Sequence, residues 1–168
     1  ALVYGTLAQR DARSRAALAR CLPRVGYHVF DVNLRLPHHD AQVTLASLRE
    51  ADFVKLNEEE CAIVGAWLGT SGDPDALRGA IESLRMTRTA HPLQLCITRG
   101  GDGALLWTEG QWHTCDAVRV DVVDTVGAGD SFLAMLLAQR LRGVEPPLAL
   151  QRAAALGGFV ASRAGAVP

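Results

Sequence analysis

The chain has 168 residues, 49% of them apolar and 21% charged, and its formal net charge is −1 at pH 7. A chain of this length can enclose one sizeable core, and its balance of charge and apolarity argues against disorder and against a nucleic-acid-binding surface. The longest apolar runs are far shorter than a bilayer-spanning helix requires, so we expect no membrane partner.

The apolar stretches alternate between the two-residue period of strands and the longer period of helices. In the first half, we predict a strand over 1–4, a helix from an Asp11 N-cap to about 22, a strand over 28–33, a helix over 41–50 capped by Asp40, a strand over 52–56, and a helix from Asn57 to about 68. In the second half, we predict a helix from Pro74 to about 86, a strand over 93–98, a hairpin of 104–108 and 112–118, an extended run ending at Val123, and helices over about 129–142 and 146–163. This alternation predicts one α/β domain over residues 1–168, with a layered, mostly parallel sheet, an antiparallel edge and helices on both faces.

The cysteines and the glycine spacings exclude several kinds of site. The four cysteines, at positions 21, 61, 96 and 115, show no C-x-x-C spacing, which predicts reduced thiols in a cytoplasmic protein. No G-x-x-x-x-G-K-[ST] sequence occurs, so a Walker-type nucleotide site is excluded. No G-x-G-x-x-G follows an early strand, which argues against a dinucleotide-binding protein.

The most informative stretch follows Val123. Gly127, Ala128 and Gly129 form a turn between the extended run and an apolar helix that Asp130 opens. Backbone N–H groups converge on an anion in such an arrangement, and glycine lets a phosphate approach closely. A carboxylate there repels the anion unless it accepts a proton from the group that attacks the phosphate. The alternative is an ordinary turn with an Asp near a helix start, and we favour the anion site with a base, which is phosphotransferase chemistry.

Polar residues also follow three of the predicted strands, at the edge where ligands bind in parallel sheets. Asn57 and Glu60 have the spacing of a capping box, and the same pair could hold a hydrated Mg²⁺, so two interpretations stay open. Thr98, Gly100 and Gly103 lie in a turn that could contact nucleotide phosphates. Asn33 and Arg35 follow another strand as candidate phosphate or substrate contacts.

Together these motifs resemble the PfkB (ribokinase-like) family of carbohydrate kinases, and among its members the fructokinase-like ones. Residues 124–132, DTVGAGDSF, are similar to a family signature almost letter for letter. Asp31-x-Asn33-x-Arg35, Lys55-x-Asn57-x-x-Glu60 and Thr98-x-Gly100-x-x-Gly103 follow the family's order and spacing. The resemblance extends over essentially the whole chain.

The resemblance implies ATP-dependent phosphorylation of a sugar hydroxyl, on a ribokinase-like sheet. It implies that Asp130 is the general base and that the amides of Gly127, Ala128 and Gly129 form the anion hole. Asn57 and Glu60 would organise Mg²⁺ through water, and Asn57 would also lie near the nucleotide. The remaining implied contacts are Thr98, Gly100, Gly103, Ala154, Gly157 and Gly158 for ATP, and Asp124, Val126, Val160, Arg163 and Gly165 for a monovalent cation such as K⁺.

Members of this family are longer, and the part that the resemblance implies is absent here is N-terminal. It carries most sugar contacts and a small lid that closes over the substrate and often forms a homodimer. We therefore expect a sugar kinase with fructose as the first candidate substrate, and ribose or 2-keto-3-deoxygluconate as alternatives. A second hypothesis is a nucleotide-binding module without turnover.

Overall fold

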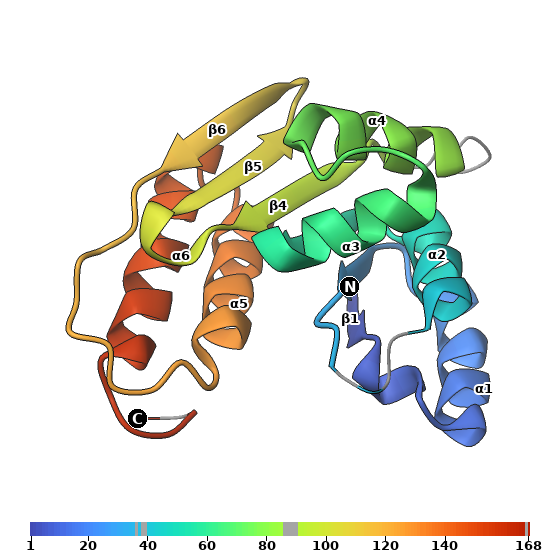
Figure 1. Cartoon of the computed structure of the whole chain (residues 1–168), viewed down its shortest axis with the longest axis horizontal. Helices are drawn as coiled ribbons and strands as arrows, with labels where there is room; N and C mark the ends of the chain where they lie inside the picture. Colours follow the sequence, from blue (N-terminus) through green and yellow to red (C-terminus); the bar gives the residue numbers. More distant parts are fainter. Residues whose placement is uncertain (36, 38–39, 86–90, 167) are drawn as a thin grey trace. The chain divides into compact units, whose positions relative to one another are not determined.

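A computed structural model of the chain describes residues 1–35, 37, 40–85, 91–166 and 168 (Figure 1). These residues form two compact units, Ala1–Ile97 and Thr98–Pro168. The described strands belong to a six-stranded sheet with the order β1-β2-β3-β4-β5-β6, in which β1, β2 and β3 pair in parallel and β5 and β6 are antiparallel. The predicted fold class, a mostly parallel sheet with an antiparallel edge and helices around it, is confirmed. The extent of a single domain over 1–168 stays a prediction.

The first unit alternates strands and helices. Its elements are β1 (Leu2–Gly5), η1 (Leu7–Gln9), α1 (Ala12–Cys21), η2 (Leu22–Arg24), β2 (His28–Asp31), α2 (Ala41–Glu50), β3 (Phe53–Asn57), α3 (Glu58–Leu68), α4 (Pro74–Leu84) and most of β4 (Gln94–Thr98). Tyr4 lies opposite Phe30 in the sheet, and Phe30 lies opposite Val54. All of β2 is buried, as expected of a parallel strand whose two faces are both covered.

Helix starts in this unit follow the local signals in the sequence. The Asp11 carboxylate accepts hydrogen bonds from the N–H groups of Arg13 and Ser14, and the Asp40 carboxylate accepts one from Val43. Both predicted N-caps are therefore confirmed. α4 begins at Pro74, as predicted; its predicted end at Met86 lies outside the described residues.

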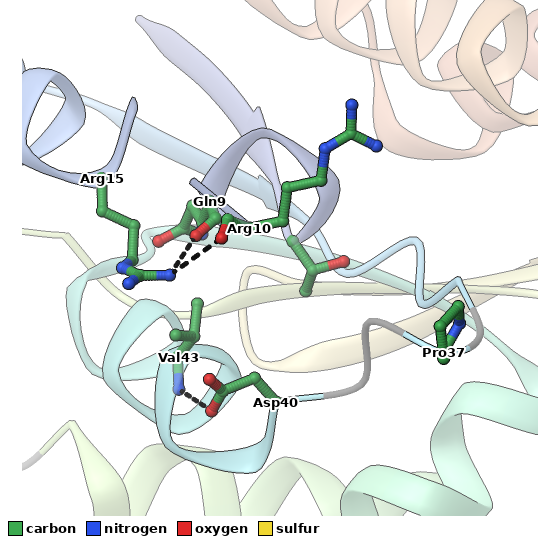
Figure 2. Close-up of a pocket in the computed structure, with 7 residues that line it drawn as sticks. Gln9, Arg10, Arg15, Pro37, Asp40 and Val43 are labelled. Atoms are coloured by element: carbon green, nitrogen blue, oxygen red, sulfur yellow. Dashed lines mark hydrogen bonds between the residues drawn. The ribbon is translucent and has the colours of Figure 1, made fainter. Parts of the chain in front are cut away.

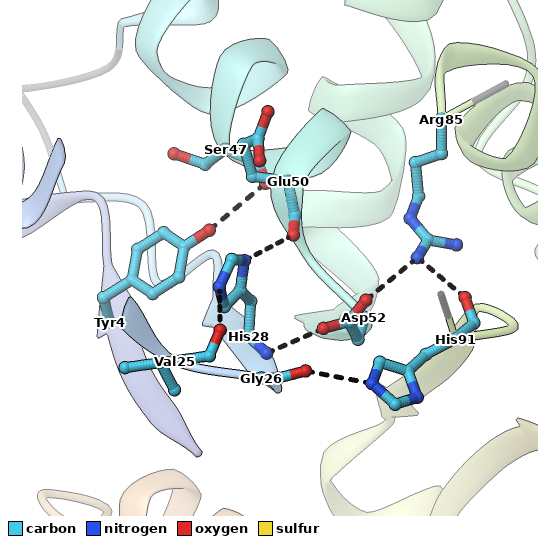
Figure 3. Close-up of polar contacts among 9 residues, drawn as sticks. All are labelled: Tyr4, Val25, Gly26, His28, Ser47, Glu50, Asp52, Arg85 and His91. Atoms are coloured by element: carbon cyan, nitrogen blue, oxygen red, sulfur yellow. Dashed lines mark hydrogen bonds and ion pairs between the residues drawn. The ribbon is translucent and has the colours of Figure 1, made fainter. Parts of the chain in front are cut away.

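A cluster of buried polar groups joins β2, β3 and the end of α4 (Figure 3). The Asp52 side chain is fully buried, and its carboxylate accepts a 2.8 Å hydrogen bond from the His28 N–H. A second oxygen of the same carboxylate lies 3.5 Å from the Arg85 guanidinium, which is itself buried. The His28 ring lies among backbone carbonyls, 2.9 Å from that of Glu50. Because a buried carboxylate is stable only when it is paired, the Arg85 guanidinium compensates the charge of Asp52.

We expect Arg85→Met to lower the free energy of unfolding by about 3 kcal/mol, because the buried Asp52 carboxylate loses the guanidinium beside it. Arg78→Met is the matched control in α4, since Arg78 pairs with Glu82, whose side chain is 41% exposed and whose charge remains in contact with water when the arginine is removed. That control should cost less than about 1 kcal/mol. Urea unfolding of both variants tests the difference, and equal losses would contradict the role assigned to Arg85.

The second unit contains η3 (Gly100–Asp102), β5 (Ala104–Thr108), β6 (Gln111–Cys115), α5 (Ala128–Leu141) and α6 (Pro146–Ala161). The predicted hairpin is confirmed: Glu109 and Gly110 both have positive φ, 56° and 79°, as a two-residue turn between twisted strands requires. α6 packs against α5 and against the hairpin. Gly157 allows the two helices to approach, because a Cβ there would lie 3.2 Å from the Ala128 carbonyl oxygen.

The extended run before the glycine turn is not a strand, so this part of the prediction is wrong. Residues 116–127 contain no strand, and the valines at 122 and 123 are 65% and 63% exposed. The N–H groups of Val123 and Asp124 both donate to the Ala161 carbonyl at the end of α6, at 2.9 and 3.2 Å. A run of β-branched residues favours extended backbone. Here, however, the hydrogen-bond acceptor is a carbonyl at the end of a helix and not a neighbouring strand, so no strand forms. β6 likewise ends at Cys115, three residues before the predicted limit of 118.

The four cysteines differ sharply in exposure. Cys21 is exposed, whereas Cys61, Cys96 and Cys115 are buried, and none of the four forms a disulfide. Burial raises the pKa of the Cys61 thiol to about 12, with smaller contributions from the Glu60 and Glu58 carboxylates. Burial also raises the pKa of the Cys115 thiol. None of the helices formed by the described residues is both long and apolar enough to cross a bilayer.

In the native chain, we therefore expect a thiol reagent at mildly alkaline pH to modify Cys21 alone, because only that thiol is accessible to a reagent. All four thiols should react after unfolding in urea. A Cys21→Ser variant is the control and should show no native reactivity. Modification of a second thiol in the native protein would contradict the burial described above.

Candidate functional site

The first turn of α5 carries the residues that the sequence singled out most strongly. Gly127 is the N-cap of α5 and has φ +80°, a left-handed conformation that favours glycine. It has to be glycine, because a Cβ would lie 2.6 Å from the Ala166 carbonyl oxygen. Gly129 lies inside the helix and is not among the glycines with positive φ. The Asp130 side chain is exposed on the same turn.

The backbone N–H groups of this turn are mostly available. Ala128 donates to the Thr125 carbonyl at 3.2 Å, which closes the turn. Within the part of the chain that the structure describes, no acceptor is within hydrogen-bonding distance of the N–H groups of Gly127, Gly129 and Asp130. Three N–H groups at a helix start, without a partner and beside an exposed carboxylate, fit an anion that takes part in proton transfer.

The Asp124 carboxylate holds the segment that leads into this turn. One carboxylate oxygen accepts from the Val126 N–H at 3.0 Å, and the other accepts from the Gly165 N–H at 3.1 Å. These two hydrogen bonds, that from Val126 first, lower the pKa of the Asp124 carboxyl. The segment after α6 is thereby tied to the segment before α5. The predicted cation ligands Asp124, Val126 and Gly165 are brought together in this way.

The other two predicted cation ligands lie at the end of α6. The Val160 carbonyl accepts from the Arg163 N–H at 3.1 Å, and the Arg163 guanidinium lies over the Phe159 ring, 5.5 Å from its centre. The next carbonyl, that of Ala161, is the one that accepts from Asp124. A carboxylate and nearby carbonyls are oxygen donors that suit a hard cation. Among the described residues, however, no three His, Cys, Asp or Glu side chains are grouped as a metal cluster.

The loop after β4 is closed on itself. The Arg99 N–H donates to the Gly103 carbonyl at 2.8 Å, and the Asp102 N–H donates back to the Arg99 carbonyl at 2.9 Å. Gly100 is exposed, whereas Gly103 is buried against the backbone of Cys115–Ala117. Thr98 is the last residue of β4, at the entrance to this loop.

Of the three α6 residues predicted to lie near ATP, two have packing roles. Gly157 is buried against α5, as described above. A Cβ on Gly158 would lie 3.4 Å from the Val118 side chain, so this glycine faces the segment after the hairpin. Ala154 is half-buried.

In the first unit, Asn57 and Glu60 form the capping box that their spacing allows. The Asn57 side-chain oxygen accepts from the Glu60 N–H at 2.9 Å, and the Glu60 carboxylate accepts from the Asn57 N–H at 2.9 Å. The other Glu60 oxygen accepts from the Leu34 N–H at 2.8 Å, so this buried carboxylate joins the ends of β2 and β3. Burial raises the pKa of the Glu60 carboxyl, although the two N–H groups and the Lys55 ammonium oppose that shift.

Two further residues of the family-like motifs lie beside Glu60. Lys55, the only lysine, forms a 3.0 Å ion pair with Asp31, and less than a tenth of either side chain is exposed. The two residues are lateral neighbours in the sheet. Asn33 is half-buried with φ 40°, and Arg35 is exposed. The positive φ of Asn33 explains why β2 ends at Asp31, two residues before its predicted limit.

The first unit also contains a hollow of about 230 Å³ (Figure 2). It is lined by Thr6, Gln9, Arg10, Arg15, Pro37, Asp40 and Val43. Arg15 is held at its wall by a 2.6 Å hydrogen bond from its guanidinium to the Gln9 carbonyl. No residue that the sequence analysis assigned to a site lines this hollow.

Sequence reasoning missed Thr6 as a residue of interest. Its hydroxyl donates to the carbonyls of Val32 and Asn33, at 2.8 and 3.0 Å. No spacing rule connects residues 26 and 27 positions apart. The only available signal is that Thr6 follows a predicted strand, as the other site residues do.

The chain matches the pfkB family of carbohydrate kinases over residues 6–168. It is 34% identical over 140 residues to a fructokinase of Rhizobium leguminosarum bv. trifolii, covering 80% of this chain and 36% of the relative. It is 40% identical over 119 residues to aminoimidazole riboside kinase of Salmonella typhimurium, covering 67% of this chain and 34% of the relative. The chain thus spans less than half the length of these curated relatives.

Solved structures agree with this match. Fructokinase from Vibrio cholerae O395, bound to fructose, ADP and calcium, superposes with a TM-score of 0.78 at 25% identity, covering 98% of this chain and 55% of that one. Aminoimidazole riboside kinase from Salmonella enterica, complexed with aminoimidazole riboside and an ATP analog, gives 0.75 at 28% identity, covering 98% and 57%. The chain therefore belongs to the pfkB family of carbohydrate kinases.

Proposed function

We propose that the protein carrying this chain transfers the γ-phosphoryl group of ATP to a sugar hydroxyl, with fructose as the first candidate acceptor. The observation that carries the proposal is the first turn of α5, where three N–H groups have no acceptor among the described residues and Asp130 is exposed beside them. Membership of the family and the fructokinase relatives support it. Ribose and 2-keto-3-deoxygluconate are the alternative acceptors.

In this proposal, the N–H groups of Gly127, Gly129 and Asp130 stabilise the negative charge of the γ-phosphoryl group during its transfer. Each well-placed donor of this kind contributes about 2.7–4 kcal/mol to a transition state. The Asp130 carboxylate accepts the proton of the attacking hydroxyl, which is worth roughly 10²–10⁴ in rate. Ala128 contributes by closing the turn, because its own N–H is engaged with Thr125.

In the first unit, the residues with a proposed role are the acceptor contacts and a carboxylate for the cation of the nucleotide. Asn33 and Arg35 are assigned to the acceptor sugar. A Mg²⁺ ion bound to the nucleotide would neutralise phosphate charge during transfer. Each Glu60 oxygen accepts one N–H and keeps a second lone pair, so the donor set fits a contact to that ion through water. Asn57 holds Glu60 in place through the capping box.

The remaining residues are assigned by their resemblance to the family's motifs. Thr98, Gly100 and Gly103 are assigned to the phosphate end of ATP, and Ala154, Gly157 and Gly158 to the neighbourhood of adenine. Asp124 is assigned to a monovalent cation, together with the carbonyls of Val126, Val160, Arg163 and Gly165. Potassium dependence of turnover tests this last assignment.

The test is a kinase assay on the full-length protein with ATP and Mg²⁺, against fructose, ribose and 2-keto-3-deoxygluconate. We expect ADP and a sugar phosphate in equal amounts, with the highest kcat/KM for fructose. ADP release that no sugar stimulates would refute the proposal.

A second candidate function is favoured by the fact that the chain spans less than half of its curated relatives. By itself, the chain could bind ATP and phosphorylate nothing. Calorimetry with ATP and Mg²⁺ beside a kinase assay on the same chain separates the two: binding without turnover supports the module, and turnover rejects it. Stabilisation by NADH but not by ATP would instead indicate a dinucleotide-binding protein.

A further inference from the structure

The turn that follows β2 contains a strained residue. Asn33 has φ 40°, and among the described residues only Glu109, in the hairpin turn, is another non-glycine residue with positive φ. Asparagine tolerates this left-handed conformation better than most residues, but it still costs free energy that neighbouring contacts must offset. Asn33 has no hairpin to impose its conformation, so other parts of the unit must hold it.

Those contacts come from three separate segments. The Thr6 hydroxyl is shared between the carbonyls of Val32 and Asn33, at 2.8 and 3.0 Å. The Val32 N–H donates to the Lys55 carbonyl at 3.0 Å, and the Leu34 N–H donates to Glu60 at 2.8 Å. The peptide groups on both sides of Asn33 are therefore engaged. Of the three partners, Thr6 is the one that bonds to both of these peptides, through the carbonyls of Val32 and Asn33, whereas Glu60 bonds only to the following peptide, through the Leu34 N–H.

The position of Thr6 follows from the sheet. β1 lies parallel to β2 with Gly5 opposite Asp31, so the residue after Gly5 comes beside the residue after Asp31. Thr6 is 6% exposed, and its hydroxyl is directed at the turn rather than at solvent. A valine of the same shape would pack in this place but would leave both carbonyls without the hydroxyl.

We infer that Thr6 is a positioning residue for acceptor binding: its hydroxyl holds Asn33 in the left-handed conformation and thereby fixes where Asn33 and Arg35 lie after β2. The inference rests on the proposed function, because those two residues are the acceptor contacts assigned there. Thr6 itself needs no contact with the sugar. Its hydroxyl fixes the backbone after β2 through hydrogen bonds, as the Glu60 carboxylate does through its hydrogen bond from the Leu34 N–H.

The test compares Thr6→Val, which removes the hydroxyl at constant shape, with Thr6→Ser, which keeps it. Thr44→Val is the matched control, because the Thr44 hydroxyl is also buried and donates to a backbone carbonyl, that of Asp40, at 2.8 Å. In the full-length protein, Thr6→Val should raise the KM for the acceptor roughly tenfold, the usual size of one lost buried hydrogen bond, and leave the KM for ATP unchanged. Thr6→Ser and Thr44→Val should keep the wild-type acceptor KM.

A second readout does not depend on turnover. Hydrogen exchange of the Leu34 amide should be faster in Thr6→Val than in Thr6→Ser, because a released turn no longer holds that N–H against Glu60. If Thr6→Val does not fold, Thr6→Ala, which also removes the hydroxyl, is compared with Thr6→Ser in its place.

The outcomes are distinct. An unchanged acceptor KM in Thr6→Val, in an active enzyme, overturns this inference and leaves the proposed function standing. An equal rise in the acceptor KM of Thr44→Val also overturns the inference, since the rise would then reflect lost stability alone. A wild-type protein that phosphorylates no sugar overturns the proposed function, and the positioning role with it.

Discussion

Asp130→Asn in the full-length protein should lower kcat for sugar phosphorylation by roughly 10²–10⁴-fold. The carboxamide has nearly the same shape as the carboxylate but cannot accept the proton of the attacking hydroxyl. The KM for ATP should change little, because the backbone N–H groups of Gly127, Gly129 and Asp130 are not altered by the substitution. Steady-state kinetics with the preferred sugar measures both parameters.

The control for this variant is Asp116→Asn, which removes another exposed carboxylate of the second unit, outside the first turn of α5. It should leave kcat near the wild-type value, so that a loss in Asp130→Asn cannot be attributed to net charge. If Asp130→Asn instead keeps near-normal turnover, Asp130 is not the base. A large rise in the KM for ATP without a loss of kcat would mean that the side chain serves nucleotide binding.

Much of the fold was predictable because its signals are local. Asp11 and Asp40 cap the helices that follow them, and Glu109-Gly110 forms the two-residue hairpin turn. Each of these features depends on residues within four positions of one another. The strand predicted before the glycine turn failed because its partner is distant in sequence: Val123 and Asp124 donate to Ala161, and nothing in residues 118–123 reveals that.

The residues of the candidate site could be predicted from the sequence, but their hydrogen-bond partners could be predicted less well. The spacing of Asn57 and Glu60 left a capping box and a Mg²⁺ contact equally open, since both use the same oxygens. The structure contains the capping box and also shows the bond to Leu34, which joins two strand ends. Thr6 could not be found in advance, because its two acceptors lie 26 and 27 residues away.

Gly103→Ala should lower the free energy of unfolding by about 4 kcal/mol, the sum of backbone strain and a steric clash. Gly103 has φ 88° and ψ −138°, a region that residues with a side chain essentially avoid. An added Cβ would lie 2.0 Å from the Cys115 carbonyl oxygen and 2.9 Å from the Ala117 nitrogen, both of them backbone atoms that cannot rotate away. Urea unfolding measures the loss.

Alanine variants of two neighbouring glycines distinguish backbone strain from steric clash as causes of the lost stability. Gly100 has φ +52° but nothing within 4 Å of an added Cβ, so Gly100→Ala should cost only the left-handed strain, about 1–2 kcal/mol. Gly101 has neither feature, so Gly101→Ala should be close to neutral. A Gly103→Ala variant no worse than Gly100→Ala would show that the loop does not approach the end of β6 this closely. If Gly103→Ala kept wild-type stability and only weakened ATP binding, the close approach to Cys115 and Ala117 would not be the reason for a glycine at this position.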